Sequence, residues 1–412
     1  MLGIGDVVIR KRGVERLRRG HLWVYRSDVQ DARDAEAGGI VCVRDERGAI
    51  VGQAFYSSQS QIALRLLVRG KEAINEDFFQ RRFEKADCLR AQRGVDPNLS
   101  RRVFSEGDLL PGLIIDRYGD RFVVQSLIQS TDKLQPLFTS ILMNRYHARS
   151  ILFRNDNRTR ELEGLPLSHE VVGEPIPTQI EVNEDGMRMA ISLESGQKTG
   201  SYLDQRENHQ AARRYAAGRA LDVFTYSGGF AIHISNVCEQ VEAIDISASA
   251  LALARLNADR NSLNNIEFIE ANAFDYLREK LSKGVRYDTI VLDPPAFAKN
   301  KDSLPSALRG YKEINYRAMR LLNPGGILIT CSCSHHIGEP LFMQMLVEAA
   351  QDAGCWIRVL ERRYQASDHP VLLTVPETLY LKCFILQLYL HRNTHILCYS
   401  YAKISGGWPR GY

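Results

Sequence analysis

Residues 220–230, ALDVFTYSGGF, combine a short apolar run with a pair of glycines. This pattern predicts a buried strand, a glycine turn and the start of a helix. The same alternation continues C-terminally, with predicted strands at 241–245, 266–269, 287–293 and 326–330 and predicted helices at 249–261, 274–281 and 311–322. Repeated strand–helix units with β-branched strands predict a parallel sheet covered by helices on both faces, so we assign residues 186–388 to the α/β class.

The chain before residue 186 has a different pattern. Up to residue 72, short apolar runs alternate with turn signals at 6–9, 39–43, 48–52 and 62–67, which predicts a small β-barrel domain. Residues 73–185 combine a predicted helix at 75–93, two strands within 113–125, a helix at 131–146 and a strand at 150–153. We therefore expect a small central α/β domain, ending near a linker at Gly173–Pro177.

Composition excludes several classes of protein. The 412 residues are 44% hydrophobic and 25% charged, with a net charge of +4, which fits a folded chain and identifies no partner. The longest apolar stretch, 379–390, is interrupted by Lys382 and Gln387, so no membrane span is expected. Eight scattered cysteines and the lack of a secretory leader pattern favour a cytoplasmic, reduced protein.

Polar and glycine residues follow the predicted strands, where an open α/β sheet binds its ligand. The second strand ends at Asp245, 23 residues after Asp222, which is a spacing typical of a carboxylate that accepts hydrogen bonds from ribose hydroxyls; the alternative is a helix N-cap. Asn272 could meet an adenine edge or could cap a helix. The candidate cofactor residues of these three turns are Asp222, Phe224, Thr225, Ser227, Gly228, Gly229, Asp245, Ile246, Asn272 and Ala273.

The fourth and fifth strands end in residues suited to catalysis. Asp293 precedes two prolines, which fix its carboxylate at the end of a buried strand. Cys333 and Cys331 follow the last strand, and a thiol at this edge would be a nucleophile. We favour Cys333 because it is farther past the apolar run; buried structural thiols are the alternative. No second Cys or His pair has zinc-ligand spacing, so no metal is expected.

These strand-end motifs resemble those of class I S-adenosylmethionine-dependent RNA methyltransferases. Residues 200–208, GSYLDQREN, further resemble the signature of the ribosomal RNA large subunit methyltransferase I family, over residues 3 to 388. The resemblance implies a Rossmann-like domain with a seven-stranded, mostly parallel sheet, S-adenosylmethionine as cofactor, and an N-terminal PUA domain. It also implies that Gln205 and Arg206 close over the cofactor and that Asp293 is one of the residues that contact it. The chain departs from the family pattern at Ser201, where Phe is common, and at Asn272, where Asp is common.

Basic and aromatic residues are concentrated in the N-terminal domain. Arginines bind phosphates and aromatic rings stack on exposed bases, so this stretch is a candidate RNA-binding surface. The alternative is a solvated basic surface with a buried tryptophan. The candidate residues are Arg10, Lys11, Arg12, Arg18, Arg19, Trp23 and Tyr25.

The expected activity is C5 methylation of an unpaired or flipped cytosine in 23S rRNA, with the Cys333 thiolate adding at C6. Asp293 would hold the cytosine edge. Two alternatives remain open: methylation of an exocyclic amine by the Asp-Pro-Pro loop, and an RNA-binding assembly factor without turnover. The sequence leaves the oligomeric state open, a homodimer included, and residues 389–412 receive no functional assignment.

Overall fold

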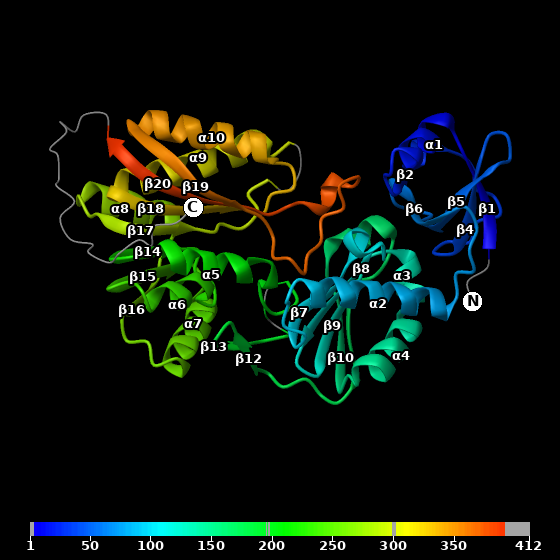
Figure 1. Ribbon diagram of the computed structural model, residues 1–412, viewed down its shortest axis with the longest axis horizontal. Coiled ribbons are helices and arrows are strands. Elements are labelled where there is room, and N and C mark those ends of the chain that lie inside the picture. The colour runs from blue at the N-terminus through cyan, green and yellow to red at the C-terminus, as the bar shows by residue number, and fades with distance from the viewer. Residues whose placement is uncertain (1–3, 195, 197, 299–301, 392–412) are drawn as a thin grey trace, which may run out of the picture.

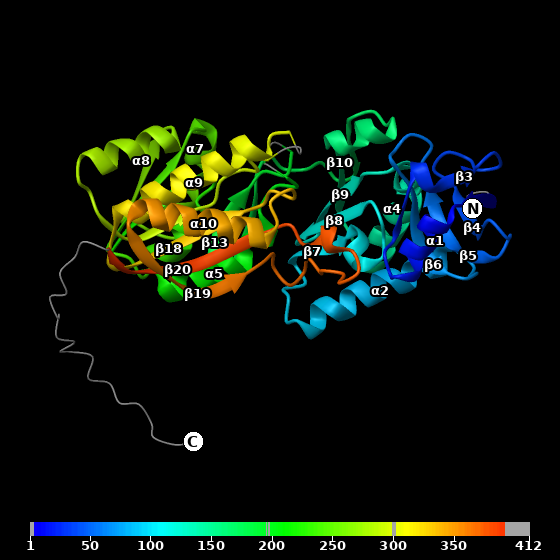
Figure 2. The same ribbon diagram turned by 90° about the horizontal axis from the view of Figure 1, so that it is seen from above.

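The computed structural model describes residues 4–194, 196, 198–298 and 302–391. Figure 1 shows three modules along the long axis, and Figure 2 shows from above that the central module lies between the other two. No described helix is both long and apolar enough to cross a membrane. We call the three modules the N-terminal module (from residue 4 to 69), the central module (from 76 to 173) and the C-terminal module (from 206 to 391).

The N-terminal module is a six-stranded sheet with the order β2-β6-β5-β4-β1-β3. β1 is parallel to β4, and the remaining pairs are antiparallel. One helix, which the sequence analysis did not predict, packs Val14 and Leu17 into the core. The elements are β1 (Ile4–Ile9), α1 (Lys11–Arg18), β2 (Trp23–Tyr25), β3 (Val29–Asp31), β4 (Ile40–Asp45), β5 (Ile50–Tyr56) and β6 (Ile62–Arg69).

The central module is a five-stranded sheet with the order β11-β10-β9-β8-β7. Its core contains Phe79 of α2 and Phe138 of α4, whose rings meet edge to face at 5.8 Å. The helix predicted at 131–146 is divided at Leu134, because Pro136 begins a new helix there. The elements are α2 (Glu76–Gln92), β7 (Leu99–Phe104), β8 (Leu113–Tyr118), β9 (Arg121–Ser126), α3 (Gln129–Lys133), α4 (Gln135–Tyr146), β10 (Ser150–Asn155) and β11 (Ser168–Gly173).

The C-terminal module contains a seven-stranded sheet with the order β16-β15-β14-β17-β18-β20-β19. Its strands are β14 (Arg219–Val223), β15 (Gln240–Asp245), β16 (Ile266–Glu270), β17 (Tyr287–Leu292), β18 (Leu322–Ser332), β19 (Cys355–Arg363) and β20 (Lys382–His391). The first five are parallel, and β20 is antiparallel to both β18 and β19. The predicted seven-stranded, mostly parallel sheet is confirmed. β20 extends three residues beyond the predicted end at 388, and residues 392–412 lie outside the described chain.

Helices cover both faces of this sheet, as expected from its apolar strands. Leu277, Ile314 and Phe342, from three helices, pack on one face, while Ala212 and Phe230, from two others, pack on the opposite face. The helices are α5 (Arg206–Tyr215), α6 (Gly229–Ser235), α7 (Ala248–Arg260), α8 (Ala273–Ser282), α9 (Leu304–Leu321) and α10 (Glu339–Ala353).

A hairpin, β12 (Ile180–Glu184) and β13 (Met187–Ile191), connects the central and C-terminal modules. Ile180 packs against the central module, whereas Met189 packs against Ile232 of α6. The domain boundary predicted at 185/186 falls in the turn of this hairpin. The hairpin therefore packs on both modules at once.

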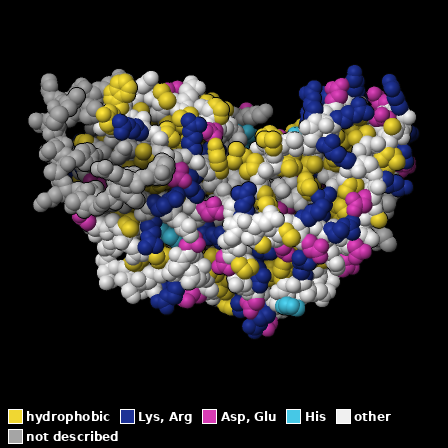
Figure 3. Space-filling view, in the orientation of Figure 1, with side chains coloured by type: hydrophobic (Ala, Val, Ile, Leu, Met, Phe, Trp, Pro, Cys, Tyr) yellow, Lys and Arg dark blue, Asp and Glu magenta, His cyan; other side chains and the backbone are white. Residues whose placement is uncertain are grey.

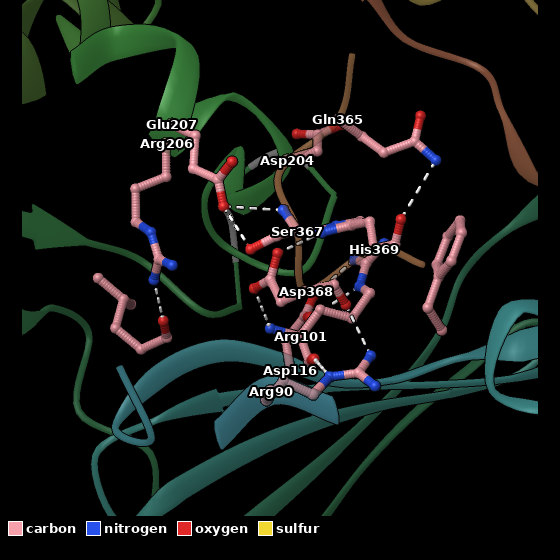
Figure 4. A network of polar contacts seen from close by, with 12 residues as sticks. Arg90, Arg101, Asp116, Asp204, Arg206, Glu207, Gln365, Ser367, Asp368 and His369 are labelled. Carbon is pink, nitrogen blue, oxygen red and sulfur yellow. Dashed lines mark hydrogen bonds and ion pairs between the residues drawn. The ribbon is translucent and has the colours of Figure 1, made fainter. Parts of the chain in front are cut away.

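A long connection between β19 and β20, residues 364–381, joins all three modules, and we call it the strap. Val375 lies in the hydrophobic core of the N-terminal module. In the central module, Arg90 donates to the Asp368 carbonyl at 2.6 Å, and the Arg101 amide donates to the Asp368 carboxylate at 2.8 Å. Figure 4 shows these contacts with the strap above the central sheet. The strap thus fixes the modules around the ends of the C-terminal strands.

Candidate active site

A cavity of about 360 Å³ lies beyond the carboxyl ends of β14, β15, β17 and β18. This is the position at which open α/β sheets bind ligands, and the volume suits a nucleoside-sized molecule. The sequence-predicted residues that line it are Gln205, Phe224, Thr225, Ser227, Gly229, Asp245, Ile246, Asp293 and Cys333. The structure therefore brings together residues from four strand ends and from the segment before β14.

The glycine turn after β14 is held in an unusual backbone conformation. Phe224 and Tyr226 have positive φ angles of 68° and 50°. Asp222 lies buried beneath the turn, where its Oδ2 accepts from the Thr225 hydroxyl at 2.6 Å and from the Ala231 amide at 3.0 Å. Burial raises the pKa of Asp222 to about 6. Asp222 is thus the internal support of the turn and does not line the cavity.

Both glycines of this turn are required by their surroundings. Gly228 has a φ of 89°, and a Cβ there would lie 2.9 Å from the Ile232 side chain. At Gly229 a Cβ would lie 2.7 Å from the His209 ring, which faces the turn from α5. Because neither glycine has a side chain, the start of α6 remains accessible from the cavity.

Asp245 follows β15 at the cavity edge. Its Oδ2 accepts from the Tyr226 amide at 3.0 Å and its Oδ1 from the Ser247 amide at 2.9 Å. Ser247, not Asp245, is the N-cap of α7. Because each carboxylate oxygen has a second lone pair, Asp245 can still accept a ligand hydroxyl. The neighbouring Ile246 is 70% exposed at the same edge, where it offers an apolar contact.

Asn272 and Ala273 do not line the cavity. Asn272 caps α8 with its side-chain oxygen, which accepts from the amides of Phe274 at 3.0 Å and Asp275 at 3.3 Å. Ala273 is the first residue of α8 and is buried. Of the two roles left open by the sequence, the geometry places Asn272 as a helix cap.

Asp293 and Cys333 face the cavity from adjacent strands. Burial raises the pKa of Asp293 to about 7, with the charge of Asp204 adding to the shift. Burial also raises the pKa of the Cys333 thiol to about 11, against the lowering effect of the Lys198 charge. The Cys333 sulfur lies 3.9 Å from the Pro294 carbonyl oxygen. A carboxyl group that titrates near neutrality and an accessible thiol therefore share one cavity.

Cys331 is placed differently, although it is only two residues away. It is fully buried within β18, opposite Cys383 of β20, and is part of an apolar cluster. Burial raises its pKa well above the ordinary value. The structure brings Cys333 to the cavity and keeps Cys331 away from it.

The wall that faces these strand ends contains residues that the sequence analysis missed. Lys198 pairs with Asp204 and lies 4.4 Å over the Tyr202 ring. Burial opposes ionisation of Asp204, but the charges of Lys198 and His369 and the hydrogen bonds from Lys198 and Tyr380 together hold the Asp204 pKa below its usual range. Tyr380 of the strap donates to Asp204 at 2.6 Å. This wall is therefore fixed by ionic contacts, which no local pattern in the sequence indicates.

Gln205 and Arg206 have different positions. Gln205 lines the cavity, where a hydrogen bond from its side chain lowers the pKa of Asp293 against the effect of burial. Arg206 points away from the cavity and donates to the Leu99 carbonyl of the central module (Figure 4). Its Nε lies 3.9 Å from an Asp185 carboxylate oxygen. It lines a second cavity of about 590 Å³ and is not among the residues that line the first. Arg206 is the first residue of α5, and its side chain points toward the central module.

Beside the glycine turn, Glu184 pairs with His209 at 2.6 Å, and both line the cavity. Burial opposes ionisation of Glu184, but the nearby His209 charge and hydrogen bond lower its pKa to about 2. Neither residue was predicted, because Glu184 ends β12 while His209 lies in α5, 25 residues later.

The predicted RNA-binding residues are distributed over α1 and β2. Arg10, Lys11, Arg18 and Arg19 are exposed, and dark blue side chains gather over α1 in Figure 3. Arg12 pairs with Asp28 at 2.6 Å. Trp23 donates its ring N–H to Glu106 of the central module at 2.8 Å, and Arg16 lies 4.3 Å over Tyr25. The two aromatic residues thus have contacts within the protein, while the α1 cations face solvent.

Comparison with known proteins identifies the family. A family model described as S-adenosylmethionine-dependent methyltransferase matches residues 160–381, and a PUA-like domain model matches residues 7–69. Ribosomal RNA large subunit methyltransferase I of Klebsiella pneumoniae (strain 342) is 39% identical over 387 residues, covering 92% of this chain and 97% of its own. The chain belongs to the ribosomal RNA large subunit methyltransferase I family. The relative from Yersinia pseudotuberculosis serotype O:1b (strain IP 31758) is also 39% identical, with coverage of 92% and 98%.

Solved structures agree with this fold. SMU.776, described as a methyltransferase complexed with SAH, superposes with a TM-score of 0.79 at 19% identity, over 93% of this chain and all of its own. A Streptococcus mutans structure described as SAM-dependent gives the same values. As a member of the large subunit methyltransferase I family, the chain is a methyltransferase that uses S-adenosylmethionine.

The cavity fits this cofactor by the chemistry of its walls. The cofactor carries ribose hydroxyls, an ammonium group and a sulfonium cation. Asp245 offers a carboxylate beside the apolar Ile246, and Asp204 has a buried oxygen that no described residue hydrogen-bonds. Hydroxyl acceptors and carboxylates facing a cationic ligand are the groups that such a molecule requires.

Proposed function

We propose that the protein methylates C5 of a cytosine in 23S rRNA, with Cys333 as nucleophile. The observation that carries the proposal is the placement of the Cys333 thiol in the cavity wall beside Asp293, while Cys331 is buried. The names of the relatives support large-subunit ribosomal RNA as substrate. The base and the atom methylated are our inference.

The proposed cofactor contacts follow from the cavity. Asp245 accepts from the ribose hydroxyls, Ile246 packs on the adenine, and the Thr225–Gly229 turn surrounds the amino-acid part. Asp222 acts through the turn that it supports. S-adenosylmethionine supplies an electrophilic methyl group when it is bound. The chain's own residues must therefore activate the acceptor, because C5 of cytosine is a weak nucleophile.

Cys333 and Asp293 provide this activation together. The thiol has a pKa of about 11 and Asp293 a pKa of about 7, so above pH 7 the pair holds one proton, mainly on sulfur. The proton passes to Asp293, directly or through water, and from it to N3 of the cytosine. The Sγ–C6 bond then forms, and the ring electrons move to C5.

The reaction ends with restoration of the thiol. Once C5 has taken the methyl group, with the sulfonium sulfur leaving as a neutral thioether, the C5 proton leaves to a water or base in the cavity and the Sγ–C6 bond breaks. The proton on N3 then returns through Asp293 to the Cys333 sulfur, so that the thiol and the aromatic ring are both restored. The charge of Lys198 lowers the pKa of Cys333 and so favours the thiolate as leaving group. The target cytosine must leave its stack, because the cavity lies within the protein wall at the strand ends.

The rival amine chemistry would place the aromatic residue of the Asp-Pro-Pro loop against the substrate. Phe297 instead packs at 4.7 Å from Tyr311 and does not line the cavity. Cys333 does line it. The geometry therefore favours attack through sulfur over amine transfer.

A pair of variants tests the proposal on unmodified 23S rRNA with tritiated cofactor. Cys333→Ala should lose at least about 1000-fold in single-turnover rate, because it removes the nucleophile. Cys331→Ala, the matched control, should stay within about threefold, because the Cys331 thiol does not reach the cavity. Bisulfite sequencing should locate the product as 5-methylcytosine.

A trapping experiment distinguishes the alternatives. RNA containing 5-fluorocytidine should form a denaturant-stable adduct with the wild type and with Cys331→Ala but not with Cys333→Ala, since fluorine cannot leave as a cation. Methylation without an adduct, undiminished in Cys333→Ala, would favour the amine reaction. Binding of RNA without any methyl incorporation would favour the alternative of an RNA-binding assembly factor without turnover.

A further inference from the structure

A buried cluster of two histidines and one glutamate separates the cavity from the second, arginine-lined cavity. Glu184 ends β12, His209 lies in α5 and His233 lies in α6, and their side chains are 4%, 7% and 1% exposed. Their donor atoms all lie within 4.8 Å of one another. The proposed methylation uses none of these groups as an acid, base or nucleophile, so the cluster needs a separate explanation.

The hydrogen bond of His233 fixes its tautomer. Its Nδ1 lies 2.8 Å from the Gly229 carbonyl oxygen, which can only accept, so Nδ1 carries the hydrogen. Nε2 therefore carries a lone pair. It is buried, has no hydrogen-bond partner among the residues that the structure describes, and lies 3.8 Å from the Glu184 Oε1. Two acceptor atoms thus face each other in a buried space, an arrangement that a cation between them would stabilise.

We propose that Glu184, His209 and His233 bind a divalent transition-metal ion of the zinc type. Imidazole nitrogen and carboxylate oxygen are zinc ligands, with bonds of about 2.0–2.2 Å. His233 already has the arrangement typical of a metal-bound histidine, with its other ring nitrogen bonded to a backbone carbonyl. At His209 the ion replaces the proton shared with Glu184 at 2.6 Å, and that proton is released to solvent.

Three protein ligands leave one coordination position. Among the residues that the structure describes, no fourth His, Cys, Asp or Glu joins the cluster. Glu184 and His209 line the cavity, so the remaining position would take a water from that side. The ion would tie the β12–β13 hairpin to α5 and α6 behind the glycine turn. We assign it a structural role there, independent of the methyl acceptor.

The first test uses the wild-type chain, stripped with a chelator and dialysed. Calorimetric titration with Zn²⁺ should give about one ion per chain. Substitution with Co²⁺ should give visible d–d bands without the near-ultraviolet charge-transfer band of a thiolate ligand. Strong near-ultraviolet bands would indicate thiolate ligands, such as the exposed Cys88, and would overturn the assignment. Failure to bind Zn²⁺ in the millimolar range would also overturn it.

The second test removes single ligands. His233→Asn retains an amide that can donate to Gly229 but lacks Nε2, so Zn²⁺ affinity should fall at least 30-fold with unchanged circular dichroism. Glu184→Gln should have a similar effect. The control is His169→Asn, because His169 pairs with Asp156 at 3.2 Å but has no third ligand. Wild-type affinity in His233→Asn would disprove the site, and that variant decides alone if Glu184→Gln does not fold.

Discussion

The two walls of the active-site cavity are held in place by different kinds of contact. The strand-end wall is stabilised within its own strand–helix units, as when Asp222 bonds Thr225 and Ala231. The facing wall, Lys198–His209, depends on partners in other modules or far along the chain. Thr199 donates to Asp116 of the central module, and Asp204 accepts from Tyr380 of the strap. The first wall therefore belongs to the C-terminal sheet, and the second forms only in the assembled chain.

The largest effect should come from the strand-end wall. Asp293→Asn should lower the single-turnover rate by about 100-fold or more, because the amide cannot pass a proton to the cytosine. In the wild type, the pKa of Asp293 near 7 predicts a rate that falls about tenfold per pH unit below pH 7. Below pH 7 the Cys333–Asp293 pair holds a second proton, whereas above pH 7 the pair keeps a single proton. The rate should therefore stop rising by about pH 7.5, and a decline above pH 8 would come from Lys382, whose charge lowers the Cys333 pKa and whose own pKa is lowered by burial to about 8.

A pH profile of single-turnover rates from pH 5.5 to 9, at saturating cofactor, checks this prediction. The Asp293→Asn variant should lack the inflection near pH 7. If the inflection persists in the variant, another group titrates there, and the assignment of the proton to the Cys333–Asp293 pair is wrong.

A smaller effect is expected from the facing wall. Tyr380→Phe removes the 2.6 Å bond to Asp204, and a hydrogen bond to a charged group contributes about 1.5–3 kcal/mol. Because Asp204 keeps its ion pair with Lys198, the lower end of this range applies, and cofactor affinity should fall about 10-fold. The single-turnover rate at saturating cofactor should change less than twofold. Equilibrium binding of S-adenosylmethionine and rapid quench measure the two quantities.

Tyr364→Phe is the matched control, since the Tyr364 hydroxyl bonds Glu339 at 2.7 Å on the exposed side of the strap. It should leave both quantities unchanged. Equal losses in the two variants would mean that the strap acts through general stability and not through the cavity wall.

The strand-end wall could be predicted from the sequence because parallel strands bring their carboxyl ends to one edge. Asp245, Asp293 and Cys333 therefore reach the cavity from the positions that the pattern indicates. Asn272 is the exception, and the sequence did indicate its role as a helix cap: an Asn just ahead of a predicted helix is a preferred N-cap. Strand position also separates Cys333 from Cys331, because one lies past the strand end and the other within it.

The facing wall could not be predicted in the same way. Lys198 and Asp204 are six residues apart in a segment without periodicity, and their orientation depends on Asp116 and Tyr380, which lie far away in the chain. Even the family signature, which suggested Arg206, could not show that its guanidinium turns toward Leu99 of the central module. Side-chain direction here follows from module packing, which spacing in the sequence does not encode.

The smallest effect should come from α1, which is part of neither wall. In the described chain Arg18 and Arg19 are exposed and form no ion pair, so we expect them to contact RNA phosphates. Arg18→Ala with Arg19→Ala should weaken binding of a 23S rRNA fragment by about threefold per residue and reduce the salt slope by about 2. Cofactor affinity should not change. Arg33→Ala is the control, because Arg33 is equally exposed but pairs with Asp31 at 2.6 Å. An unchanged salt slope in the double variant would place the RNA on another surface, and a loss of cofactor affinity would show that α1 is coupled to the cavity after all.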